Sequence, residues 1–247
     1  MKFSLINILL LLLLSSVAYN TEKSANKIIN QVIKNFDNID CKFDLTIVKK
    51  QKSKPDKLKL YSINIFHPQN DTVLRMIRID TVKPVNLSEV SYWEHSYLID
   101  KKKNRWLTLP ITNKLKILGD DDKIDNDNIL ENILLDLENV LSNKNSVINN
   151  EIKNNVSMSI IESISDTKQH IWIDNDNYRI LRIDYFNKYG RVIKEVKFSN
   201  FNTLGGISMP RVVNIKDKKK KINYIANINN FQLVTSFDNN FFQPKGK

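Results

Sequence analysis

The stretch from Ile171 to Phe242 constrains the fold of this chain more than any other part. Runs rich in β-branched and aromatic residues alternate there with short clusters of Asn, Asp, Gly and Lys, which is the pattern of consecutive β-hairpins. This pattern predicts an antiparallel meander. The expected turns are Asp174–Asn177, Asn187–Gly190, Leu204–Gly206, Asp217–Lys220 and Asn229–Asn230.

Each strand of this meander has one apolar face. Alternation with a period of two is typical of a sheet that buries one side and leaves the other side polar. The clearest sets that share a face are Ile222, Tyr224, Ala226 and Ile228 in one strand, and Val192, Val196 and Phe198 in another.

Two amphipathic segments are available to cover the apolar side of the sheet. The first begins at Ser24 as N-cap, and the second spans Asn128–Leu141, where Asn128 and Glu131 form a capping pair. Apolar residues recur in both at helical spacing. Together these features predict a mainly β (α+β) fold, in which a strongly curved antiparallel sheet wraps over helices. The two stripes are Ile28, Ile29, Val32, Ile33 and Phe36, and Leu130, Leu134, Leu137 and Leu141.

Shorter strands are expected before the meander. A polar hairpin loop, Lys50–Lys57, separates the first two strands, and an acidic surface loop is predicted at Gly119–Asn128. Asn143–Asn155 is predicted to be a polar connection. The expected strands are Asp40–Lys49, Lys57–Phe66, Thr72–Asp80, Leu87–Glu94, Ser96–Asp100, Arg105–Leu109, Lys114–Leu118 and Val156–Ser163.

The N-terminus has the features of a secretory signal peptide. Lys2 is followed by the apolar run Leu5–Leu14 and by the small-residue cleavage pattern Ser16-Val17-Ala18, so Tyr19 is the expected mature N-terminus. The run is shorter than the ~20 residues that span a bilayer, and an uncleaved anchor is the alternative. We expect residues 1–18 to be a signal peptide and residues 19–247 to form one exported, soluble domain. Its single cysteine, Cys41, excludes a disulfide within the chain.

The chain is strongly basic, with a formal net charge of +11. Such a charge favours anionic surfaces, including acidic lipid headgroups or acidic partners, although a general enrichment in Lys, Asn and Ile also explains it. The run Lys218–Lys221 is either a solvated hairpin tip or a contact for membrane headgroups. Nucleic-acid binding is disfavoured by the export signal and by the lack of basic–aromatic interleaving.

Motifs of known catalytic and metal sites are missing from the sequence. It contains no phosphate-binding loop, no nucleophile elbow and no HExxH zinc motif, and its three histidines, His67, His95 and His170, lack ligand spacing. Asp120, Asp122 and Glu131 fit positions of a calcium loop, but Asp125 stands where that loop needs glycine. We therefore predict a protein that is not an enzyme and that has no metal and no cofactor.

Several segments resemble the LolA-like family of outer-membrane lipoprotein-sorting proteins. Residues 105–123 are similar to its W-x-x-LP-x-x-x-K-x-x-x-I segment, and residues 172–190 are similar to its W-V-D…Y-x-I-L-K…G hairpin. Gly119–Asn128 departs from the family, because it lacks the aromatic residues usual there. The matching residues are Trp106, Leu109, Pro110, Lys114, Leu118, Trp172-Ile173-Asp174, Tyr178–Asp184, Gly190, Phe198, Met209-Pro210-Arg211 and Phe241–Pro244.

The resemblance implies an incomplete antiparallel β-barrel whose open side is lidded by helices around an apolar cavity. It also implies a monomeric periplasmic carrier that takes up the acyl chains of lipoproteins from an inner-membrane transporter and delivers them to an outer-membrane acceptor. A bare acyl chain does not cross an aqueous gap, because each exposed CH₂ costs about 0.8 kcal/mol. We expect ten residues to line or border the cavity: Phe43, Leu45, Leu60, Met76, Trp93, Trp106, Leu109, Ile133, Leu134 and Leu137.

Two alternatives remain open from the sequence. The same fold can carry lipids other than lipoproteins across the periplasm. The chain can also be an exported structural β protein with a filled core, in which case the ten residues are ordinary core residues.

Overall fold

The computed structural model describes residues 24–245 with several gaps. The predicted signal peptide, residues 1–18, lies outside the described residues. The gaps are 36–38, 69–71, 84–89, 98–101, 109–111, 113, 120–121, 123–128, 135–139, 142, 166 and 239.

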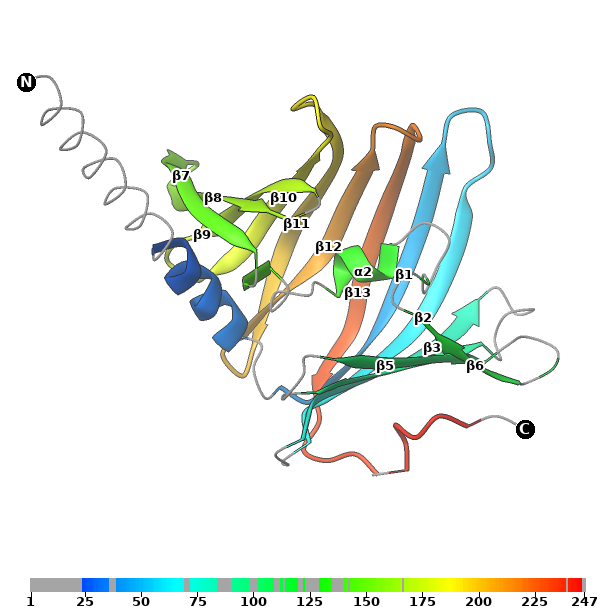
Figure 1. The fold of residues 1–247 in the computed structure, drawn as a ribbon. Coiled ribbons are helices and arrows are strands. Elements are labelled where there is room, and N and C mark those ends of the chain that lie inside the picture. The colour runs from blue at the N-terminus through cyan, green and yellow to red at the C-terminus, as the bar shows by residue number, and fades with distance from the viewer. Residues whose placement is uncertain are drawn as a thin grey trace, which may run out of the picture. The chain divides into compact units, whose positions relative to one another are not determined.

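The chain is mainly β, and its thirteen strands form one antiparallel sheet in the order β6-β5-β4-β3-β2-β1-β13-β12-β11-β10-β9-β8-β7 (Figure 1). This order confirms the meander that the turn spacing predicts. The strands are β1 (Cys41–Gln51), β2 (Lys57–Phe66), β3 (Val73–Lys83), β4 (Ser91–Tyr97), β5 (Lys103–Thr108), β6 (Leu115–Leu118), β7 (Lys144–Lys153), β8 (Val156–Ile164), β9 (Lys168–Asp174), β10 (Arg179–Phe186), β11 (Val192–Leu204), β12 (Ile207–Asp217) and β13 (Ile222–Leu233).

The residues cluster into two compact units, which are described separately. The first unit is Met1–Asn35, Asp136–Phe198 and Asp217–Lys219, and the second is Phe36–Leu135, Ser199–Lys216 and Lys220–Lys247. The single domain expected over residues 19–247 stays a prediction.

In the first unit, the predicted N-terminal helix is present over residues 24–34. It buries Ile29 and Val32, each 1% exposed, as the apolar stripe predicts. The side chain of Asn145 donates a hydrogen bond to the Oδ1 atom of Asn26, and Asn35 donates one to the carbonyl of Asn177. These bonds hold the helix to β7 and to the turn between β9 and β10.

The core of the first unit comes from one face of its strands. Val147, Ile161, Ile171, Ile183 and Val196 lie opposite one another in the pairings of β7 to β11. Ile161, Ile171, Ile183 and Val196 are at most 2% exposed. At the start of the β9–β10 turn, the Asp174 carboxylate accepts hydrogen bonds from Arg179 at 2.6 and 3.1 Å.

In the second unit, the helix α2 (Ile129–Ile133) buries Ile129 and Leu130. The helix predicted over Asn128–Leu141 is only partly seen: α2 ends at Ile133 and a bend follows at Leu134. Residues 135–139 lie outside the described part of the chain, and residues 140–141 are helical. The apolar period of that segment continues past the point where the backbone turns, so periodicity alone does not mark the end.

Three strand and turn predictions are wrong. Leu87–Glu94 and Ser96–Asp100 were expected to be two strands, but β4 continues through Glu94 and Ser96. The polar connection expected at Asn143–Asn155 is mostly the strand β7. The expected turn at Asn229–Asn230 is a bulge within β13, where the register with β1 shifts and Asn230 has a φ of 52°. Asn adopts this left-handed conformation more readily than most residues, in bulges as well as in turns. The sequence of this bulge therefore resembles that of a turn.

Candidate functional site

The second unit has a broad sheet face made of apolar side chains. Register places Phe43 opposite Ile63, and Ile63 opposite Ile79 on the next strand. On the other side of β1, Leu45 lies opposite Ile228. We call this surface the apolar face, and all its members are buried: Phe43, Leu45, Ile47, Tyr61, Ile63, Ile77, Ile79, Tyr92, Ile222, Tyr224, Ala226 and Ile228.

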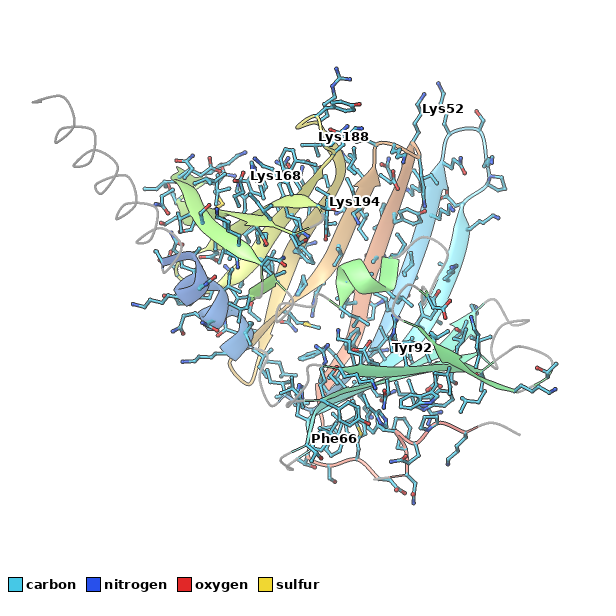
Figure 2. All side chains as sticks on the ribbon, viewed as in Figure 1. Lys52, Phe66, Tyr92, Lys168, Lys188 and Lys194 are labelled. Carbon is cyan, nitrogen blue, oxygen red and sulfur yellow. The ribbon has the colours of Figure 1, made fainter. Side chains whose placement is uncertain are left out.

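On β2, β3 and β4, the opposite face is contacted by the C-terminal segment that follows β13. Phe242 is 0% exposed, and its ring stacks on Phe66 with the centroids 5.5 Å apart. The Arg78 guanidinium lies 4.3 Å from the ring centroid of Phe241 and donates a hydrogen bond to its carbonyl at 3.0 Å. We call this surface the tail-covered face. Figure 2 labels Tyr92 on the apolar face and Phe66 on the tail-covered face.

The structure divides the ten predicted cavity residues between these two faces. Phe43 and Leu45 lie on the apolar face. Three others lie on the tail-covered face, because register pairs Met76 with Phe66 and Trp93 with both Arg78 and Trp106. Leu60 points to the same side of β2 as Phe66, since side chains alternate along a strand. Ile133 and Leu134 are half-buried where α2 ends, and Leu109 and Leu137 lie outside the described residues.

Strand β4 shows why hydrophobicity alone did not separate the faces. Five consecutive residues, from Tyr92 to Ser96, are buried, so both sides of this strand are covered. Trp93 and Tyr92 are equally buried but point to opposite faces. The sequence contains no signal for this difference unless the C-terminal segment is known to cover one side.

A polar cluster that the sequence analysis missed lies at one margin of the apolar face. The Glu94 side chain is 9% exposed, and its Oε2 atom accepts a hydrogen bond from the Tyr92 hydroxyl at 2.6 Å. Its Oε1 atom accepts one from Ser96 at 3.3 Å. Two cations approach the same carboxylate, Arg75 at 3.6 Å and Lys103 at 3.7 Å. In the sequence, the polar groups of Tyr92, Glu94 and Ser96 recur at every second position of one strand, and this alternation could have revealed the cluster.

The cluster compensates the charge of a buried carboxylate. Burying an unpaired carboxylate is costly, whereas ion pairs and hydrogen bonds offset that cost. The Nε atom of Arg75 is buried and makes no hydrogen bond. The apolar face is therefore flanked, at the β3–β4–β5 margin, by a small group of fixed charges.

The three histidines each have a protein partner. His95 Nε2 lies 2.9 Å from the carbonyl oxygen of Phe242, and His170 Nε2 lies 3.1 Å from a Glu162 oxygen. The backbone N–H of His67 donates to Asp40 at 2.7 Å. Burial, together with Arg75 and despite Asp40, lowers the pKa of His67. Within the described part of the chain, no three His, Cys, Asp or Glu side chains gather as a metal site would need.

None of the helices in the described residues is long and apolar enough to cross a bilayer.

Comparison with known proteins places the chain among proteins of this fold. A family model described as "-like: Uncharacterized protein" matches residues 75–246. No protein with a curated description matches the sequence.

Three solved structures are similar over most of the chain. A DUF1329 family protein from Desulfovibrio piger has a TM-score of 0.78 at 15% identity, covering 90% of this chain and 97% of its own. A putative outer membrane lipoprotein-sorting protein domain from Vibrio parahaemolyticus has a TM-score of 0.74 at 16% identity, with the same coverage. A LolA superfamily protein from Nitrosomonas europaea has a TM-score of 0.64 at 13% identity, covering 89% of this chain and 97% of its own.

These likenesses concern the fold. They confirm the resemblance to LolA-like proteins that the tryptophan and proline motifs predict. The helical lid that the resemblance implies is only partly seen. The described helices are residues 24–34 in the first unit and α2 in the second.

Proposed function

We propose that this chain, which belongs to the protein family described as "-like: Uncharacterized protein", is a non-enzymatic carrier that binds acyl chains on its apolar face. In the finer form of the proposal, it works in the periplasm and carries lipoproteins towards the outer membrane. An inner-membrane transporter would load it and an outer-membrane acceptor would unload it. Two proteins with this fold, described as a putative outer membrane lipoprotein-sorting protein domain and as a LolA superfamily protein, support that form.

The observation that carries the proposal is the extent of the apolar face. Its twelve residues come from five strands, β1 to β4 and β13, and on β2 to β4 the tail-covered face already has its own aromatic cover. An apolar surface of this size requires a partner that removes it from water. We propose that α2 provides this partner in the empty protein and that an acyl chain replaces it.

The element α2 is suited to being displaced. It has five residues, far below the ~12–15 that a helix needs to persist alone in water, so its stability depends on packing. In the view of Figure 1, α2 lies in front of β13 and β1. Its described buried side chains are Ile129 and Leu130, which makes it a small cover for a large face.

The energies favour this exchange. Fourteen methylene groups that leave water gain roughly 11 kcal/mol in total. Burial of one Ile or Leu side chain is worth about 1.5–3 kcal/mol, so exposing Ile129 and Leu130 costs less than the acyl chain returns. The chain contains no phosphate-binding loop, so loading from a membrane would draw its energy from the transporter.

Two other functions compete with this one. A carrier of phospholipids or other lipids would use the same face and would differ only in its cargo. A structural protein with a filled core is the second alternative. It is favoured by the complete burial of Leu45, Ile63 and Ala226, each 0% exposed.

Lipid binding by the purified protein tests the proposal. The full-length chain is expressed so that its own leader is processed, purified without detergent and analysed by native mass spectrometry for bound lipid. Displacement of a fluorescent acyl probe then gives the affinity. Saturable binding supports a carrier, and a folded protein with neither bound lipid nor probe binding overturns the proposal in favour of the filled core.

A matched pair of variants locates the site. Ile133→Glu places a charge at the half-buried end of α2, and Ile117→Glu places the same charge on β6, where the native side chain is 75% exposed. Because α2 competes with the acyl chain for the apolar face, the proposal predicts tighter probe binding for Ile133→Glu and unchanged binding for Ile117→Glu. Release of lipoproteins from isolated inner membranes by the native protein distinguishes the sorting role from carriage of other lipids.

A further inference from the structure

The second unit carries a concentration of lysine at one end of β1, β2 and β13. The β1–β2 hairpin region, residues 49–57, contains five lysines and one aspartate, and Lys220 and Lys221 directly precede β13. Register pairs Gln51 with Ile222, so the two segments are adjacent. We call them the lysine tips, and Lys52 marks the first of them at the top of Figure 2.

Most of these lysines are exposed to solvent. Lys50, Lys52, Lys54 and Lys57 are exposed, as are Lys220 and Lys221. Within the described residues, no ion pair joins Lys50, Lys52, Lys54 or Lys57 to a carboxylate. Their charges are therefore not neutralised locally, and they produce a positive potential at this end of the sheet.

The residue type narrows the class of partner. The lysine tips contain no arginine and no aromatic residue. Arginine and aromatic side chains are enriched at protein–protein interfaces, from which lysine is depleted. Aromatic side chains also stack on bases in nucleic-acid binding sites. Lysine is a compact, mobile charge that suits a diffuse layer of headgroups.

We propose that the lysine tips dock the protein on a membrane surface that is rich in anionic lipid headgroups. Strands β1 and β13 run directly from these tips into the apolar face, beginning with Ile222 and Tyr224. Docking by the tips therefore directs the end of the apolar face towards the bilayer. The docking surface is distinct from the acyl-binding face and does not require that acyl chains bind there.

Vesicle sedimentation tests this proposal on the full mature protein. Vesicles of neutral phosphatidylcholine are compared with vesicles in which about a third of the lipid is anionic phosphatidylglycerol. Each lysine near an anionic surface contributes about 1 kcal/mol, equivalent to roughly fivefold in partitioning. We expect clear preference for anionic vesicles at low salt and loss of binding near 1 M salt, where the Debye length falls to about 3 Å.

A charge-matched pair of variants makes the test specific. One variant replaces the tip residues Lys50, Lys52, Lys54 and Lys57 by Gln, and the other replaces four exposed lysines elsewhere by Gln: Lys27, Lys34, Lys42 and Lys153. Both variants lose the same net charge. The proposal predicts at least a roughly 100-fold loss of partitioning for the tip variant and a much smaller loss for the other.

Three outcomes overturn the proposal. The first is equal binding to neutral and anionic vesicles, and the second is an equal loss in the two variants, which shows an effect of net charge alone. The third is tighter binding to polyglutamate or to RNA than to vesicles, which assigns the tips to an acidic polymer. Because the assay does not involve acyl transfer, its failure leaves the carrier function standing, and loss of acyl binding leaves this proposal standing.

Discussion

The Nε2 atom of His95 lies 2.9 Å from the carbonyl oxygen of Phe242, although 147 residues separate them. A carbonyl oxygen only accepts hydrogen bonds, so the imidazole donates through Nε2. The bond lies in the buried interior of the tail-covered face, where the His95 ring also meets Trp106 edge-on with centroids 5.0 Å apart. The C-terminal segment is therefore an integral layer of the second unit.

Phe242→Ala should strongly destabilise the second unit. The native ring is 0% exposed and contacts Phe66, Phe237 and Phe241. Truncation of a buried Phe typically costs about 3–5 kcal/mol, because it removes apolar burial and leaves a cavity. Urea unfolding measures the change. The control is Gln243→Ala at the exposed neighbour, and equal stability of the two variants would show that the segment is not part of the core.

Removal of the Glu94 carboxylate should cost more than its conservative replacement. Glu94→Ala leaves Arg75 and Lys103 without their carboxylate and the Tyr92 hydroxyl without its acceptor. Breaking a largely buried ion pair on one side costs about 3–5 kcal/mol. Glu94→Gln keeps an acceptor for Tyr92 and should unfold at a higher urea concentration than Glu94→Ala. The reverse order would contradict the assigned network.

Asp174 should make the first unit sensitive to acid. Burial raises the pKa of its carboxyl, but hydrogen bonds from Arg179, Asn177 and the backbone of Asp176 outweigh this effect, and the pKa falls below its usual value of 3.8. A carboxyl with a lowered pKa in the folded state stabilises the protein above its unfolded pKa. That stability is lost as the pH falls towards the folded pKa.

Asp174→Asn therefore tests this contribution through its pH dependence. At pH 7 the variant should lose about 1–3 kcal/mol, as expected for hydrogen bonds to a charged group. As the pH falls below 4 the difference in stability between the variant and the native protein should shrink, and it should vanish below the pKa of Asp174 in the folded protein. A deficit that stays constant from pH 7 to pH 3 would show that the shape of the side chain matters rather than its charge.

Cys41 should be unreactive in the folded protein. The side chain is 4% exposed, and burial together with the nearby Asp40 raises the pKa of its thiol to about 12. The thiolate is the reactive form, so at pH 8 a thiol reagent should label the native protein far more slowly than the urea-unfolded protein. Comparable labelling rates in the two states would place Cys41 at the surface.

The sequence predicted the elements whose signals are local. The hairpins expected after Ile171 are present. They could be predicted because Gly, Asn and Asp favour turns through their own backbone conformations, which do not depend on distant residues. Strand β7 was missed because its polar sequence lies at an edge of the sheet, where one-sided burial leaves Ile148 and Ile152 exposed. The bulge at Asn230 was taken for a turn for a similar reason, since both use a positive φ.

The candidate site was predicted less well than the fold. Phe43 and Leu45 lie on the apolar face, whereas Trp93 and Trp106 face the C-terminal segment. A shift of one residue along a strand exchanges the faces, and only the pairing of distant strands decides which face a residue occupies. The Glu94 network depends on three strands in the same way, so no single segment reveals it.

Photo-crosslinking with a diazirine-bearing fatty acyl probe shows whether an acyl chain binds on the apolar face. The labelled residues are identified by tandem mass spectrometry, with an unlabelled acyl chain as competitor. We expect labelling that the competitor suppresses on the apolar face, at residues such as Phe43, Leu45, Tyr92 and Tyr224. Labelling confined to Trp93 and Trp106 on the tail-covered face, or no competed labelling of the folded protein, would contradict it.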